Sequence, residues 1–203
     1  MQVSRIWHYL LRASYKRTIL GIFVRTLVSG REERKTVFTK VEEALLLIKK
    51  FDPKRFNQIQ SLVRCIFVFG DPTARGKWHQ DLQTCEIQEE YVRSPDTAIS
   101  EIASTIVHEA THARLMRLDI DYQEPKRLRI ERICFKAEQA FARRLPDPDR
   151  DKLVQQAEQM LTLDKSCFTD AGRRAADLKA LRSLGCPGWL VRLLDWWTAR
   201  RAS

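Results

Sequence analysis

Residues 96–117 read DTAISEIASTIVHEATHARLMR, a stretch without glycine or proline. Apolar residues recur in it at helical spacing, at Ile102, Ile106, Ala110 and Ala113. This periodicity predicts a single helix that is buried along one side. Ser94 and Pro95 precede the stretch and are typical of a helix start, with serine as the cap and proline at the first helical position.

The predicted helix carries the pattern His-Glu-x-x-His, with His108, Glu109 and His112 at the three defined positions. Two histidines at this spacing project from the same helix face, so both imidazoles can reach one zinc ion. The glutamate between them then turns toward a water at the open position of the metal. A solvated surface helix with a chance match is the simpler alternative, and the surrounding sequence favours the metal site.

A catalytic zinc site usually has three protein ligands. Glu131 follows His112 after eighteen residues, within a segment at 127–138 that has no helix breaker. At these residues the chain resembles the gluzincin metallopeptidases, in which HExxH is followed, after a spacer of about this length, by a glutamate on a second helix. The resemblance implies a peptidase that binds Zn²⁺ through His108, His112 and Glu131 and uses Glu109 as general base.

Glu138 is a second candidate for the third ligand. It lies seven residues after Glu131, so both carboxylates and Cys134 between them project from one helix face. One glutamate can bind the metal while the other orients a ligand histidine through its second ring nitrogen. Cys134 is expected to be a small buried residue, because a thiolate beside a glutamate would make an unusual mixed site.

Two short strands are predicted before the metal-site helix. Residues 62–69 are rich in β-branched and aromatic residues and stop at a Gly-Asp-Pro turn, whereas residues 83–92 alternate only in part. In the zincins that the chain resembles, the last strand before the helix runs along the cleft and pairs with extended substrate. The resemblance, which covers residues 62–146, assigns this role to residues 85–92, because an exposed strand edge can bind a peptide backbone.

Peptidases of this kind often use a tyrosine or histidine to stabilise the oxyanion. Tyr122 and His79 are the candidates here. The alternatives are a packed tyrosine whose hydroxyl reaches water and a loop histidine beside Trp78. The chain is also similar to bacterial metallopeptidases of unknown substrate with a HEATH-type helix and a following glutamate-rich helix, so the resemblance indicates a chemistry but no substrate.

The 203 residues are expected to form one α+β, mostly helical zincin-like domain with a small sheet before the metal-site helix. Residues 1–60 are predicted to supply N-terminal helices, residues 61–146 the sheet and the metal-site helices, and residues 147–203 the C-terminal helices. Within these regions, helices are expected at 37–50, 149–163, 169–184 and 189–200. Trp189, Leu193 and Trp196 share one side of the last helix and are expected to dock on the core.

The net charge is +10, which permits acidic proteins, anionic membranes or nucleic acids as partners. No nucleic-acid motif accompanies the charge, so no specific nucleic-acid partner is expected. The five cysteines form no CxxC pair and favour a reducing, cytoplasmic compartment. Residues 6–28 do not resemble a secretory signal; they are predicted to form a packing helix or, alternatively, a basic helix lying on a membrane surface.

The sequence therefore predicts a zinc-dependent hydrolase that acts on a peptide or protein substrate. A zinc-bearing regulatory or interaction module without activity is the main alternative, and the intact Glu109 favours the enzyme. A membrane-peripheral basic protein with a chance HEATH motif is the second alternative.

Overall fold

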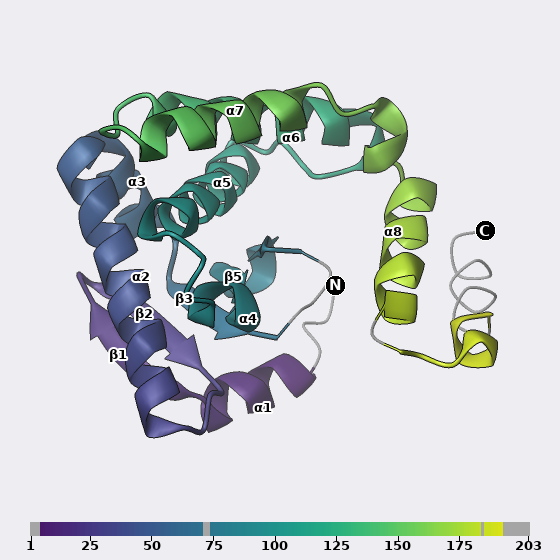
Figure 1. Cartoon of the computed structure of the whole chain (residues 1–203), viewed down its shortest axis with the longest axis horizontal. Coiled ribbons are helices and arrows are strands. Elements are labelled where there is room, and N and C mark those ends of the chain that lie inside the picture. Colours follow the sequence, from purple (N-terminus) through teal and green to yellow (C-terminus); the bar gives the residue numbers. More distant parts are fainter. Residues whose placement is uncertain (1–4, 71–73, 184, 193–203) are drawn as a thin grey trace.

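A five-stranded mixed sheet forms the central layer, with helices packed on both of its faces (Figure 1). The computed structural model describes residues 5–70, 74–183 and 185–192. The strands are β1 (Tyr15–Ile19), β2 (Ile22–Thr26), β3 (Cys65–Phe69), β4 (Gly76–His79) and β5 (Thr84–Gln88). Their order is β1-β2-β3-β5-β4; β2, β3 and β5 are parallel, and both edge strands are antiparallel to their neighbours.

The helices are α1 (Arg5–Ala13), α2 (Arg31–Phe51), α3 (Pro53–Leu62), α4 (Glu89–Arg93), α5 (Ile99–Arg117), α6 (Glu124–Ala142), α7 (Asp149–Leu161) and α8 (Asp170–Ser183), with short 3-10 helices η1 (Gln80–Leu82) and η2 (Lys165–Phe168). Figure 1 shows α6 and α7 side by side and α8 standing apart from the sheet. The fold is α+β and mostly helical, as the sequence predicts.

Alternation along β3 divides the apolar residues between the two faces of the sheet. Ile66 and Val68 join the main core, where they meet apolar side chains of α2 and α5. Phe67 and Phe69 point to the other face and pack against the Trp7 ring of α1, with ring centroids 5.8 and 6.2 Å apart. Trp7 of α1 thus packs on this face of the sheet. None of the described helices is long and apolar enough to cross a membrane.

Helix α5 is the central helix of the domain and contacts α2, α3 and α6 as well as β4 and β5. The prediction of burial along one side is therefore wrong, since polar residues of α5 such as Ser104 and Thr111 are buried too. Helix α5 also begins later in the chain than predicted. Ser94 ends α4, and the first turn of α5 is capped by the Glu101 carboxylate, which accepts a hydrogen bond of 3.0 Å from the Ala98 backbone N–H.

Residues 15–26 form the β1–β2 hairpin, so the prediction of helices throughout residues 1–60 is wrong for this segment. The two turn residues, Leu20 and Gly21, both have positive φ angles, 48° and 82°, which suit a tight hairpin. Ile22 and Val24 alternate into the core while the basic side chains of β1 remain exposed. The apolar residues of this segment alternate with a period of two, as in a strand, and do not follow the helical period of 3.6.

The second predicted strand, at 83–92, is shorter than expected. β5 ends at Gln88, and the chain then turns into α4. β5 also lies inside the sheet between β3 and β4, so the assignment of the cleft-side edge to residues 85–92 is wrong. β4 occupies that edge instead. With four residues and a glycine at its start, β4 has too little alternation to be recognised from sequence.

The C-terminal helices agree with prediction, with α7 and α8 close to the expected 149–163 and 169–184. Helix α6 ends at Ala142, just before the Leu-Pro-Asp-Pro segment. Trp189 is 64% exposed, so its predicted docking on the core is wrong. Leu193 and Trp196 lie outside the described residues.

Candidate metal centre

His108 and His112 face each other across one turn of α5. Their Nε2 atoms are 3.2 Å apart, and both residues are largely buried. A tetrahedral zinc ion with ligands at about 2.1 Å places two ligand atoms about 3.4 Å apart. The two imidazoles therefore already stand at the separation that one zinc ion requires.

Glu131 of α6 provides a third potential metal ligand beside the two histidines. One carboxylate oxygen lies 3.2 Å from His108 Nε2 and the other lies 3.6 Å from His112 Nε2. The two nitrogens and the carboxylate thus converge on one point from two packed helices. A His₂Glu donor set of this kind is typical of catalytic zinc sites that keep one position open.

Glu138 lies on the opposite side of the His108 ring. Its carboxylate is 2.5 Å from His108 Nδ1, and its other oxygen accepts a hydrogen bond of 3.0 Å from the Ser104 hydroxyl. A carboxylate on Nδ1 fixes the ring orientation and leaves Nε2 directed at the metal position. The geometry thus favours Glu131 as the ligand and Glu138 as the residue that orients His108.

Cys134 also lies close to the histidines, and the ligand atoms of Cys134, His108 and His112 fall within 4.8 Å of one another. Burial raises the pKa of the Cys134 thiol, and the carboxylates of Glu131, Glu109 and Glu138 raise it further. Both Glu131 and Cys134 therefore lie within reach of a metal ion held by the two histidines.

The charges of the centre are coupled. Burial raises the pKa of Glu131, but hydrogen bonds and charge from His108 outweigh it and lower this pKa to about 2. Burial lowers the pKa of His108, yet its bonds to Glu131 and Glu138 hold that pKa well above the ordinary value. The ionised Glu131 carboxylate thus lies beside a positive charge on His108. A divalent metal ion would place a positive charge beside the same carboxylate.

Glu109 lies on the same helix between the two histidines and is buried. Burial raises the pKa of its carboxyl to about 8, although the nearby His108 opposes this. Edge strand β4 approaches Glu109 closely at Gly76, where a Cβ atom would stand 2.7 Å from Glu109 Oε1. The absence of a side chain at position 76 therefore allows β4 to lie against α5 beside the candidate base.

A cleft of about 540 Å³ opens over these residues. β4 forms one wall through Gly76, Lys77 and Trp78, and Met160 of α7 and Phe168 of η2 also line the cleft. The sequence analysis identified neither β4 nor these residues of α7 and η2 as parts of the cleft. They are separated from the HEATH motif by tens of residues and have no regular spacing relative to it.

Tyr122, a predicted candidate for the oxyanion helper, lies at the centre. Its hydroxyl donates a short hydrogen bond to Glu131, and its ring packs edge-on against the His112 ring at 5.2 Å. The hydroxyl therefore does not simply reach water. Through this hydrogen bond Tyr122 can orient Glu131, the candidate ligand. Tyr122 also lines the cleft, where an oxyanion helper would be needed.

His79 is not a loop residue but the last residue of β4. Its Nε2 atom lies 2.5 Å from the buried Glu86 carboxylate, and its ring packs against Trp7 with a centroid separation of 4.4 Å. These contacts lie on the face of the sheet covered by α1, and His79 does not line the cleft. Its candidacy as an oxyanion helper is thus not supported by its position.

Comparison of the chain with protein-family models, with curated proteins and with solved structures finds no match in any of the three, so the site is interpreted from its own geometry and from the motif that it contains.

Proposed function

We propose that this protein is a zinc-dependent hydrolase that cleaves peptide bonds. The observation that carries the proposal is the triangle of His108 Nε2, His112 Nε2 and the Glu131 carboxylate, with separations of 3.2, 3.2 and 3.6 Å. The order of these residues in the chain, which resembles that of the gluzincins, favours zinc. When bound, zinc polarises a carbonyl oxygen and lowers the pKa of a water to about 7.

Glu109 is the residue in position to move the proton. It follows His108 directly and its carboxylate lines the cleft. Glu109 would accept a proton from the attacking water and deliver it to the leaving amine nitrogen. The water oxygen forms the new bond to the carbonyl carbon, the amide C–N bond breaks, and the proton held by Glu109 ends on the amine.

Edge strand β4 is suited to position an extended substrate. Within the described chain it pairs only with β5, so its outer edge has no strand partner, and Gly76 to Trp78 line the cleft. A peptide that added a strand at this edge would run past Glu109 and the metal position. This role, which the resemblance to zincins implied for residues 85–92, is therefore proposed for β4.

Metal analysis and peptide cleavage together test the proposal. The full chain is purified, its zinc is quantified by mass spectrometry, and cleavage of a peptide library is followed by mass spectrometry. We expect wild type to hold one zinc and cleave, Glu109→Gln to keep zinc and be inert, and His108→Ala to lose both. Glu43→Gln, at an exposed position on α2, is the matched control and should behave as wild type.

The outcomes separate the alternatives. A wild-type chain that holds no zinc, with no change on His108→Ala, would overturn the metal site. A chain that binds zinc through His108, His112 and Glu131 but cleaves no peptide in the library would instead favour a regulatory or interaction module.

A further inference from the structure

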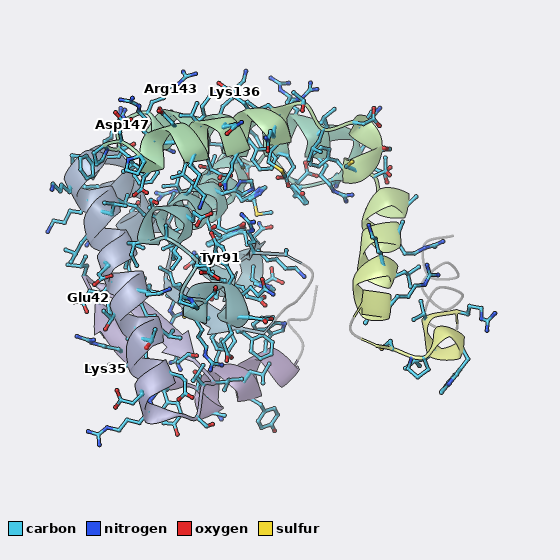
Figure 2. All side chains as sticks on the ribbon, in the orientation of Figure 1. Lys35, Glu42, Tyr91, Lys136, Arg143 and Asp147 are labelled. Atoms are coloured by element: carbon cyan, nitrogen blue, oxygen red, sulfur yellow. The ribbon has the colours of Figure 1, made fainter. Side chains whose placement is uncertain are left out.

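Helix α6 presents a basic face on the side opposite the candidate metal centre. Arg129, Arg132 and Lys136 are exposed along this face, and Lys165 of η2 joins them at the same hollow. Figure 2 shows Lys136 at the outer margin of the molecule. We call these four side chains the basic groove.

Within residues 5–70, 74–183 and 185–192, the cations of the basic groove have no acidic partner. Among the described residues, none of the four forms an ion pair, whereas Lys126 earlier in α6 is paired with Asp121 at 2.7 Å. No acidic residue stands three or four positions from Arg129, Arg132 or Lys136 along the helix, where it could neutralise them. Four cations therefore concentrate positive potential over one short surface.

The groove is recessed and partly apolar. The hollow has a volume of about 490 Å³, and Pro125, Leu128 and Ile133 line it together with the four cations. Leu128 and Ile133 are only partly buried, so they remain accessible between the charged side chains. An apolar floor with a charged rim is typical of a surface that binds polypeptide.

The groove is separate from the cleft, although the two are neighbours. Glu131 and Glu138 project from α6 toward α5, while the basic side chains project away from it. The 3-10 helix η2 borders both places, because Lys165 lines the groove and Phe168 lines the cleft. A segment held in the groove would thus lie one short helix away from the cleft.

We infer that the basic groove binds an acidic segment of a partner protein, with carboxylates on the four cations and aliphatic side chains on Leu128 and Ile133. Charge complementarity and the aliphatic floor select this occupant. The groove has no aromatic side chain on which a nucleic-acid base could stack, and its apolar residues are recessed rather than protruding toward a bilayer. The inference does not depend on the proposed hydrolase activity.

A binding assay tests the inference directly. The probe is a fluorescent peptide rich in glutamate with isolated leucines, and anisotropy is measured with the full chain in the Glu109→Gln background, so that hydrolysis cannot intervene. The triple change Arg129→Gln, Arg132→Gln and Lys136→Gln should weaken binding on the order of tenfold or more. Rising salt should weaken wild-type binding as well.

The control is a triple change that removes the same charge elsewhere: Arg12→Gln, Arg31→Gln and Lys35→Gln, all at exposed positions. Figure 2 shows Lys35 on α2, far from Lys136. The control should bind the probe as wild type does, and circular dichroism should show both triple variants folded. The double variant Leu128→Ser with Ile133→Ser should also weaken binding, because these two side chains contact the aliphatic residues of the bound segment.

Three results would overturn the inference. The first is no binding of the acidic peptide at low salt. The second is an equal loss in both triple variants, which would assign binding to overall charge. The third is tighter binding of a single-stranded oligonucleotide or of phosphatidylserine vesicles than of the peptide, lost in the groove variant alone, which would assign the groove to nucleic acid or membrane.

Discussion

Gly76 of β4 lies directly against Glu109 of α5, and a Cβ atom at position 76 would stand 2.7 Å from the Glu109 Oε1 atom. A second close neighbour, the Thr105 side chain, would also be met at 2.7 Å. The contact between Gly76 and Glu109 thus fixes the position of β4 relative to the candidate base. Any side chain at position 76 must therefore displace either β4 or the side chains of both Glu109 and Thr105.

We expect Gly76→Ala to lower peptidase activity on the order of tenfold to a hundredfold, because it displaces the base by a fraction of an ångström. Zinc content should be unchanged, since the three heavy atoms nearest to a Cβ at position 76 belong to Glu109 and Thr105 and not to a histidine. Steady-state kinetics and metal analysis check this. Gly70→Ala, where a Cβ atom would meet nothing within 4 Å, is the matched control and should leave activity intact. Equal activity in both variants would contradict the proposed position of the base.

Glu131 and Glu138 should differ in their effect on zinc. Glu131→Ala removes a ligand and should abolish stable zinc binding, whereas Glu138→Ala removes the partner of His108 Nδ1 and should weaken affinity about tenfold to a hundredfold. Competition with a chromogenic chelator measures both. The reverse order of effects would make Glu138 the ligand.

Tyr122→Phe separates an orienting role from a catalytic one. Because the hydroxyl donates to Glu131, we expect zinc affinity to fall about tenfold to a hundredfold, roughly the contribution of one hydrogen bond to a charged group. Chelator competition and kinetics on the zinc-loaded enzyme are compared. Unchanged affinity together with a large loss of kcat would instead identify Tyr122 as the oxyanion helper.

Truncating a buried side chain of α5 should lower the free energy of unfolding more than truncating an exposed side chain of α2. Ile106 is fully buried in the main core, so Ile106→Ala should lower the free energy of unfolding by about 2–5 kcal/mol. Leu46 on α2 is 46% exposed, and Leu46→Ala should cost less than about 1 kcal/mol. Urea denaturation followed by circular dichroism measures both. Similar losses would contradict the central position of α5.

Much of the helical content was predictable because helical periodicity is local. The 127–138 segment lies within α6, and the predicted helix at 37–50 lies within α2. The β1–β2 hairpin was missed because its core residues, Ile22 and Val24, are too few to distinguish a strand from an apolar helix segment.

The sequence by itself determined that His108 and His112 share one helix face with Glu109 between them, because the spacing of four residues matches the pitch of the helix. Only the tertiary structure decided which glutamate approaches Nε2 and which approaches Nδ1, since Glu131 and Glu138 share a face of α6 and differ only in how that helix packs on α5. It also placed β4, rather than β5, at the edge beside Glu109. Strand order depends on contacts between distant segments, and local spacing carries no information about them.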